Sequence, residues 1–400
     1  MFTSLIAAHR SLGEAWFRTG KFDQAREEFL TAQTLSSKYQ VKRSICEATL
    51  NLGWTYGIIG EHKIAMEYYA SCLTQFQNFD DPELRCKLES ELAATTRSMG
   101  NLSEADKHYE KSLILAKELN DPVLIGTALN GLSISESEYG HFERSIAYSK
   151  EAIAIAEQIQ DNYRIRNYLS NLGDTYVFHG DYVSARIYLD RALEIAQRIE
   201  NPNGTAVTLG YIGGLCLALK EYGEAEKAFT SSLKMYRKLN NNRRIKWCLL
   251  YLGQICMRQG HLAEALEFLL EAKNFDYAYH NVRNYVLLGI ALTRSGDFAE
   301  ARVTFDKSIE TVSEYLQFQP SGFSALFSRA LALAGLCSIS TGAEKESLIL
   351  QVFNAYTTAV DNCQERGVLE QELSCLNDLS LVAHESWFRS ISELLSKYLA

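Results

Sequence analysis

The sequence has little proline and no long apolar run. Only four prolines occur among its 400 residues, and no segment is rich in proline or low in complexity, so we expect no extended disordered linker. No apolar stretch is long enough to cross a bilayer, and the start of the chain lacks the basic region and long apolar core of a secretory signal peptide. These absences predict a cytoplasmic protein with no membrane partner.

An excess of basic charge is also missing. The formal net charge is −9, with both signs mixed along the chain, whereas a nucleic-acid-binding domain usually carries a strongly basic patch. We therefore expect no nucleic-acid partner. The nine cysteines are scattered and form no CxxC pair, which favours reduced, buried thiols over disulfides or a metal site.

The chain carries no recognisable catalytic motif. It has no phosphate-binding Walker loop, no GxGxxG, no HExxH and no GxSxG. Its eight histidines are dispersed, and we interpret His62, His141 and His261 as solvent-exposed turn residues because each lies just after a predicted turn. The sequence therefore predicts a protein that is not an enzyme and has no catalytic residue, no bound metal and no cofactor.

What the chain does contain is an internal repeat with a period of 40 residues. A glycine recurs at this spacing, with only Lys220 interrupting the series, at Gly20, Gly60, Gly100, Gly140, Gly180 and Gly260. Eight residues earlier, an aliphatic residue recurs at Leu12, Leu52, Leu92, Leu132, Leu172, Ile212 and Leu252. A small residue follows each of these, at Gly13, Gly53, Ala93, Ser133, Gly173, Gly213 and Gly253. Several columns at one fixed spacing indicate stacked copies of a single structural unit.

The spacing within one unit predicts two antiparallel helices. Leu12 and Trp16 lie one helical turn apart, and Ala25 and Phe29 repeat that spacing after the turn. The glycine at Gly20 is expected to end the first helix at a positive φ. Small residues in the column after Leu12 are expected to let the two helices approach closely.

The regular pattern weakens toward the carboxyl end. An eighth copy is four residues shorter and contains Leu288, Gly289, Gly296, Ala301 and Phe305. A looser ninth hairpin is expected at Phe323–Arg366, turning near Gly342. The sequence therefore predicts an all-α fold, a right-handed α-solenoid of about nine antiparallel helical hairpins. We expect residues 1–318 to form eight hairpins and residues 319–400 to form a degenerate hairpin and a capping helix, continuous with the array.

Polar residues mark several helix starts. Asp81, Asp121 and Asn201 each precede a proline, which predicts an N-cap followed by proline at the first helical position. Ser386 is expected to cap a final amphipathic helix that covers the last apolar face of the solenoid. The alternative for this final helix is a docking site for a second subunit.

The repeat resembles the tetratricopeptide repeat family. Its pattern is clearest in Leu52-Gly53…Tyr56…Ala65…Tyr69 and in Leu172-Gly173…Tyr176…Ala185. The resemblance covers residues 1 to about 310 well and the remainder loosely. The unit is longer than the common one, and the proline that usually ends the second helix is missing. In its length it is similar to the repeats of kinesin light chains, Pins-type adaptors, sensor arrays of signalling NTPases and bacterial peptide-pheromone receptors.

The resemblance implies that the first helix of each hairpin lines a concave groove that holds a partner. The side chains expected in this groove are Arg10, Glu14, Asn51, Trp54, Lys87, Arg97, Asn130, Asn167, Asn171, Asp174, Phe178, Trp247, Tyr251, Gln254, Arg258, Arg283 and Arg294. Its asparagines resemble those that hold a peptide backbone in such grooves, its arginines suggest an acidic partner segment, and its aromatic residues are candidate anchors. The alternative for each side chain is an ordinary solvated or packing role.

The sequence therefore predicts a scaffold or adaptor that binds a protein or peptide segment. The alternative is a ligand-sensing array of a larger signalling protein, such as a STAND-type ATPase or a peptide-pheromone receptor. The first predicted helix lies within Met1–Thr19 and has no covering element. We therefore expect a dimer partner or an attached effector to cover the N-terminal face.

Overall fold

The computed structural model describes residues 2–76, 81–275, 278–382 and 385–399 of the chain. Across these ranges the chain forms twenty helices and no strand. The helices are α1 (Phe2–Arg18), α2 (Phe22–Lys38), α3 (Lys42–Ile59), α4 (His62–Phe76), α5 (Pro82–Ser98), α6 (Leu102–Glu118), α7 (Pro122–Tyr139), α8 (Phe142–Gln158), α9 (Asn162–His179), α10 (Tyr182–Arg198), α11 (Pro202–Ala218), α12 (Tyr222–Lys238), α13 (Asn242–Gln259), α14 (Leu262–Lys273), α15 (Ala278–Ser295), α16 (Phe298–Phe318), α17 (Phe323–Ile339), α18 (Gly342–Asn362), α19 (Arg366–Ser380) and α20 (Ser386–Ser396).

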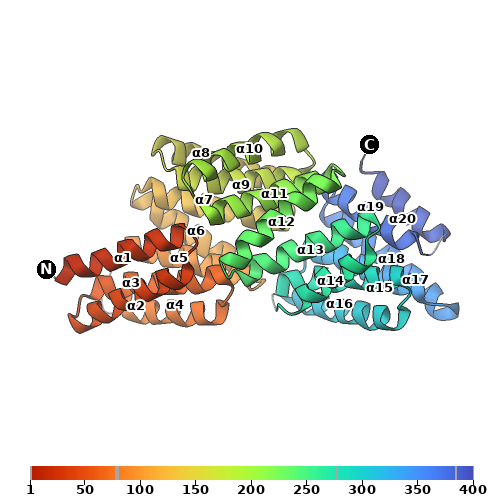
Figure 1. Ribbon diagram of the computed structural model, residues 1–400, viewed down its shortest axis with the longest axis horizontal. Coiled ribbons are helices and arrows are strands. Elements are labelled where there is room, and N and C mark those ends of the chain that lie inside the picture. The colour runs from red at the N-terminus through yellow and green to blue at the C-terminus, as the bar shows by residue number, and fades with distance from the viewer. Residues whose placement is uncertain (1, 77–80, 276–277, 383–384, 400) are drawn as a thin grey trace.

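Neighbouring helices pair into hairpins that stack into an elongated superhelix (Figure 1). Each odd-numbered helix up to α17 packs most closely against the even-numbered helix that follows it. The predicted all-α solenoid is thereby confirmed. The segment in which the ninth hairpin is expected contains α17 and α18, and the division of the chain at residue 318 stays a prediction.

A small residue in the first helix of most hairpins lets a large side chain of the second helix pack against its backbone. A Cβ atom added at Gly213 would lie 2.7 Å from Cδ2 of Phe229, which is closer than packed atoms approach. The ring of Phe229 is fully buried, so it has no free space to move into. The same pairing recurs in other hairpins, between Gly13 and Phe29, Gly53 and Tyr69, Gly173 and Leu189, Gly253 and Leu269, and Gly289 and Phe305.

The turn glycines end the first helices as predicted. Their φ values lie between +80° and +96°, in the left-handed region that favours glycine. Lys220, which interrupts the glycine series, keeps the same type of turn with a φ of 62°. The turn geometry is therefore retained even where the backbone must accept a side chain.

The predicted N-caps at three helix starts are confirmed. The side chains of Asp81, Asp121 and Asn201 each accept a hydrogen bond from a backbone N–H of the turn that follows the proline. The prediction for Ser386 is wrong. Ser386 is the first residue of α20, and Glu385 occupies the N-cap position without capping the helix, because its carboxylate accepts a hydrogen bond from the indole of the next residue but one.

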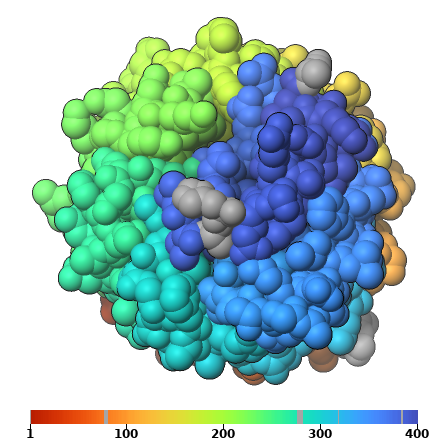
Figure 2. Space-filling model, turned by 90° about the vertical axis from the view of Figure 1, so that its right-hand side faces the viewer, coloured from red at the N-terminus to blue at the C-terminus, as the bar shows by residue number. Residues whose placement is uncertain are grey.

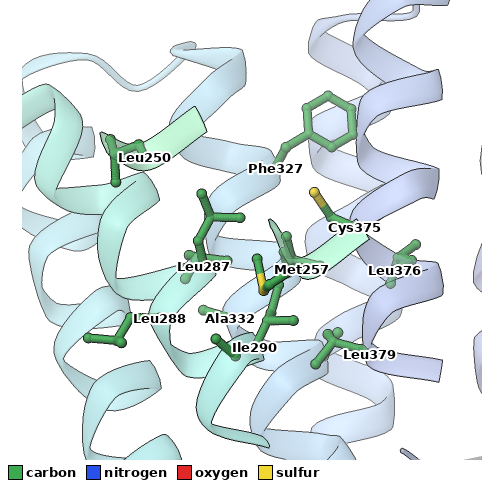
Figure 3. Packing of buried hydrophobic residues seen from close by; sticks show 14 of the residues in the cluster. Leu250, Met257, Leu287, Leu288, Ile290, Phe327, Ala332, Cys375, Leu376 and Leu379 are labelled. Carbon is green, nitrogen blue, oxygen red and sulfur yellow. The ribbon is translucent and has the colours of Figure 1, made fainter. Parts of the chain in front are cut away.

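The last helices close the carboxyl-terminal end of the core. Figure 3 shows Cys375, Leu376 and Leu379 of α19 packed near Phe327 of α17 and Ile290 of α15, and all of them are buried in one cluster. Seen along the long axis, the C-terminal helices extend over the middle of this end of the molecule (Figure 2). The interior of the superhelix is therefore covered here.

Successive turns of the superhelix touch each other. His179, at the end of α9, lies 2.8 Å from the carboxylate of Glu365, 186 residues further along the chain. Close by, the hydroxyl of Tyr182 donates a 2.5 Å hydrogen bond to Glu370. The turn glycines Gly20, Gly100, Gly140 and Gly180 all face side chains of the following superhelical turn. These contacts enclose the space between the turns.

All nine cysteines are buried and free, as predicted. Among the helices of the described ranges, none is both long and apolar enough to cross a membrane.

Buried ion pairs anchor α19. The carboxylate of Asp378 lies 2.7 Å from Nε of Arg258 and 3.3 Å from Nη1 of Arg294, and no more than about a tenth of any of the three side chains is exposed. Burial raises the pKa of Asp378, while the two guanidiniums act in the opposite direction. The pair of arginines therefore depends on this one carboxylate for neutralisation.

Adjacent glycines in α11 allow a matched test of the close approach. Gly213→Ala should destabilise the protein by about 1–3 kcal/mol because the new methyl group would overlap the Phe229 ring. Gly214→Ala has nothing within 4 Å of the added atom and should stabilise the same helix by about 0.5–1 kcal/mol. Urea denaturation of both variants measures the difference, and equal effects would contradict the packing argument.

Removal of the carboxylate that anchors α19 should be costly. Asp378→Ala leaves two buried guanidiniums without a counter-charge and should destabilise the protein by about 3–5 kcal/mol. The matched control is Glu221→Ala, which breaks a surface pair with Arg186 and should cost less than about 1 kcal/mol. A small loss of denaturation free energy for Asp378→Ala would mean that α19 does not depend on this contact.

Candidate functional site

The odd-numbered helices enclose a cavity of about 710 Å³ inside the superhelix. Its walls come from α5, α7, α9, α11, α13, α15, α17 and α19, together with the turn between α3 and α4 and one side chain of α16. A cavity of this size is within the usual range of small-ligand sites. We refer to it as the channel cavity.

Nine of the side chains expected in the groove line the channel cavity. They are Arg97, Asn167, Asn171, Asp174, Phe178, Trp247, Tyr251, Gln254 and Arg283. Four of them share one face of α9, where their spacing of four, three and four residues keeps them in line. Asn130 lies next to this row and is buried, and its side-chain oxygen accepts a 3.0 Å hydrogen bond from Asn171.

The expected groove residues of the first hairpins are not among those lining the channel cavity. Arg10 forms ion pairs with Glu14 at 3.7 Å and with Glu47. Trp54 stacks on a neighbouring phenylalanine at 3.6 Å between ring centroids, and Lys87 pairs at 2.7 Å with an acidic residue one helical turn away. Asn51 is half-buried in α3, outside the cavity wall.

Two of the expected arginines are structural neighbours of α19 instead. Arg258 and Arg294 are both engaged with Asp378, and neither lines the channel cavity. Both side chains lie on the inward face of their helices, but α19 covers the carboxyl-terminal part of that face. Sequence reasoning within one repeat could not reveal this cover, because Asp378 of α19 lies 84 residues from Arg294 and still further from Arg258.

The sequence prediction missed several cavity residues. Arg243, Arg244 and Tyr211 line the cavity from α13 and α11, and His62 lines it from the start of α4. Arg243 lies four residues before Trp247 and so shares its helix face. Applying the same inward spacing one helical turn closer to the start of α13 would have identified Arg243. The expected solvent exposure of His62 is wrong, because the turn faces the cavity rather than bulk solvent.

The basic part of the cavity is electrostatically unusual. Nε of Arg243 is buried and has no hydrogen-bond partner in the part of the chain that the structure describes. Burial, followed by the charges of Arg244 and Arg97, lowers the pKa of Arg243 to about 10. Burial also lowers the pKa of His62 to about 4, and Arg243 and Arg97 act in the same direction. His62 is therefore neutral at physiological pH.

One acidic side chain in the cavity titrates near physiological pH. Burial raises the pKa of Asp174 to about 7, although Arg244 opposes this shift. The guanidinium of Arg244 lies 5.3 Å from the ring centroid of Trp247 and 6.0 Å from that of Tyr211, which are cation–π distances. Arg244 is thus held by aromatic faces.

The remaining wall is aromatic and apolar. Trp247 and Tyr251 meet edge to face at 5.6 Å, and Phe178 of α9 meets Phe323 of α17 in the same way at 6.4 Å. The second pair joins two successive superhelical turns across the cavity wall. The channel cavity therefore combines guanidinium groups, asparagine amides and aromatic rings, which suits recognition of a peptide-like ligand.

Metal ligation has no structural support in the described ranges. No group of three or more histidine, cysteine or acidic side chains there is arranged to hold a metal ion.

Comparison with solved structures identifies proteins of the same fold. A Rap protein complexed with competence and sporulation factor matches with a TM-score of 0.65 and 14% sequence identity, over 89% of this chain and 99% of that chain. NprR in complex with its cognate peptide NprX matches with a TM-score of 0.56 and 12% identity, over 89% and 99%. The apo form of the quorum sensor NprR from B. thuringiensis matches with a TM-score of 0.54 and 13% identity, over 90% and 100%. At such low identities the likeness establishes the fold alone.

Sequence comparison gives a family but no individual relative. No curated protein matches the chain. One model of the tetratricopeptide repeat matches residues 84–158, 164–238 and 212–278, and a second model of the same repeat matches residues 6–29 and 285–307. Together these matches cover more than half of the chain, and the matches at 84–158 and 164–238 begin near the starts of α5 and α9. The chain belongs to the tetratricopeptide repeat family.

Proposed function

We propose that this protein is a receptor that binds a short peptide segment in its channel cavity. The observation that carries the proposal is the enclosure of the cavity of about 710 Å³ by helices from two successive superhelical turns. An open groove would suit a folded partner, whereas an enclosed channel suits an extended segment. The asparagine row on α9 offers amides for a peptide backbone, and the aromatic wall offers surfaces for side chains.

The structural neighbours support the same proposal. The Rap protein was solved with competence and sporulation factor, and NprR with its cognate peptide. Both share the fold of this chain over nearly their whole length. A peptide ligand is therefore the natural first candidate for a cavity in the interior of this superhelix.

The charge of the cavity favours an acidic segment. Arg97, Arg243, Arg244 and Arg283 contribute four guanidiniums to the wall. Two carboxylates in the wall are already engaged, since Glu138 pairs with Arg97 at 2.5 Å and Glu372 pairs with Arg283 at 3.0 Å. Glu61 and Lys63 also line the cavity with opposite charges, and Asp174 is only partly ionised near its pKa of about 7. The two arginines of α13 therefore carry the remaining positive charge and attract a ligand of opposite charge.

A sensing role is the second candidate, and the contacts between superhelical turns favour it. His179 and Tyr182 bond to residues at the start of α19, and Phe178 and Val368 line the cavity beside these contacts. A ligand in the cavity would therefore touch both turns and could change their separation. The dimer partner or attached effector expected at the N-terminal face stays a prediction.

Filling the cavity should abolish peptide capture. Ser324→Trp adds an indole to the cavity wall at the start of α17, and we expect it to weaken peptide binding about tenfold or more because the channel becomes too narrow. The measurement is capture from a pool of random linear heptapeptides by the immobilised full chain. Retained peptides are identified by mass spectrometry and their affinities are determined by calorimetry.

Ser231→Trp is the matched control for this experiment, because Ser231 lies exposed on the outer helix α12. It should bind as the unmodified protein does. Equal affinities for the unmodified protein and Ser324→Trp would show that peptides bind elsewhere, and retention of no peptide by any form would reject the proposal.

Binding of an acidic peptide should also depend on pH through Asp174. Below its pKa of about 7 this carboxyl is neutral, and above it the negative charge repels an acidic ligand. We expect the affinity of a captured acidic heptapeptide to be about three- to tenfold higher at pH 6 than at pH 8. Asp174→Asn should remove this dependence and give the higher affinity at both pH values.

Glu91 provides the control for the pH effect. Burial raises its pKa to about 8, so it titrates in the same range, but it does not line the channel cavity. Glu91→Gln should leave the pH dependence of binding unchanged. His62 does not interfere, because its pKa of about 4 keeps it neutral across this range. A pH dependence that survives in Asp174→Asn would contradict the assignment.

A further inference from the structure

We infer that Arg243, together with Arg97 and Arg244, forms a subsite in the channel cavity that binds a carboxylate group of the ligand. The inference rests on the proposed function, because it names the chemical group by which a bound peptide is recognised. It is distinct from a general preference for acidic ligands, since it assigns the recognition to Arg243 and the two arginines beside it.

Arg243 differs from Arg97 and Arg283 in having no counter-charge among the described residues, and its neighbour Arg244 is held by aromatic rings instead. Arg97 pairs with Glu138 at 2.5 Å, and Arg283 pairs with Glu372 at 3.0 Å. Among the described residues no carboxylate lies within ion-pair distance of Arg243, and its Nε is buried without a hydrogen-bond partner. A guanidinium group has five N–H donors, so an unpaired one inside a protein is an open binding position for an anion.

The surroundings of Arg243 are unfavourable for its positive charge when no ligand is bound. The removal of this half-buried side chain from water, followed by the charges of Arg244 and Arg97, disfavours its protonated form, which is why its pKa falls to about 10. The group still carries its charge at neutral pH. An uncompensated buried charge destabilises a protein unless a partner arrives, and a ligand carboxylate would provide that partner.

The charged and titratable groups that face Arg243 do not provide the counter-charge themselves. His62 is neutral at neutral pH. Glu138 attracts Arg243 weakly, but it is bonded to Arg97. Asp174 acts on Arg244, and its own burial raises its pKa to about 7. The subsite therefore remains positive, because His62 is neutral, Glu138 is paired and Asp174 is only partly ionised at neutral pH.

The chemistry of the subsite favours a carboxylate. A guanidinium binds a carboxylate through two parallel N–H···O bonds, which gives both strength and orientation. The rings of Trp247 and Tyr211, against which Arg244 rests, would border the same ligand group and exclude water from it. The carboxylate comes from the ligand's free C-terminus or from an aspartate or glutamate side chain.

The empty protein offers the first test. Arg243→Met removes the uncompensated charge and should raise the Tm in sodium chloride by about 2 °C or more. Replacing chloride with sodium acetate at equal ionic strength should raise the Tm of the unmodified protein but not that of Arg243→Met. Arg243→Lys keeps the charge without the planar fork and should show a smaller acetate effect.

Two control variants make this test specific. Arg191→Met removes an exposed arginine that pairs with Glu157 at 2.6 Å, and it should change neither the Tm nor the acetate effect by more than about 1 °C. Arg283→Met removes an arginine that has a buried partner and should lower the Tm. A lower Tm for Arg243→Met, or an equal acetate effect in both proteins, would overturn the subsite.

Peptide capture tests the same subsite and separates the two sources of the carboxylate. Two pools of random heptapeptides are compared, one with free C-terminal carboxylates and one with C-terminal amides. Retention that disappears on amidation assigns the C-terminus, and retention of aspartate- or glutamate-containing amides assigns a side chain. Either result supports the subsite if Arg243→Met loses about tenfold or more of the affinity.

The outcomes also distinguish this subsite from the proposed function. If Arg243→Met captures the same peptides with unchanged affinity, the subsite is wrong and the peptide receptor stands. If no peptide is retained but the acetate effect depends on Arg243, the anion subsite stands and the peptide receptor is wrong.

Discussion

The close approach of the two helices in each hairpin is the constraint on which the rest of the structure depends. A backbone without a side chain at positions such as Gly213 lets a buried ring pack directly on the first helix. Repetition of this contact every 40 residues fixes nearly the same geometry between successive hairpins. The superhelix that results is tight enough for one turn to touch the next, as the contact between His179 and Glu365 shows. Enclosure of the channel cavity is thus a consequence of packing inside the repeat.

The same constraint explains which features could be predicted from the sequence. The hairpins, the left-handed turns and the caps at Asp81, Asp121 and Asn201 depend on residues close in the chain, so their patterns are visible in one repeat. The inward face of α9 could be predicted for the same reason. The surroundings of Arg258 and His62 could not. The first is covered by α19 and the second faces the interior, and both facts depend on segments that meet only after the superhelix has closed.

The arginines show that the same type of residue at similar positions of the repeat can have different roles. Arg258 and Arg294 share a buried carboxylate and stabilise the attachment of α19, while Arg243 lies in the cavity wall without one. All three belong to inward faces of first helices, so sequence position gives them one interpretation. What separates them is whether the fold brings an acidic side chain to within ion-pair distance. A paired arginine adds to stability or costs little, whereas an unpaired buried one lowers stability and is explained best by a ligand.

Enclosure also bears on the choice between a passive scaffold and a sensor. The C-terminal helices lie over one end of the molecule (Figure 2), and a ligand in the channel cavity would contact helices of two successive superhelical turns. The contacts between superhelical turns are less extensive than those within a hairpin, and they include the polar contact of Tyr182 with Glu370 and the aromatic contact of Phe178 with Phe323. The contacts within each hairpin are the most extensive in the structure and resist separation. Binding energy would therefore act on the spacing of the turns while the hairpins stay intact. Phe178 belongs to both the cavity wall and the contact between turns. Binding of a ligand in the cavity and the spacing of the superhelical turns are therefore linked through the same side chain. A sensor requires such a link, whereas a passive scaffold does not.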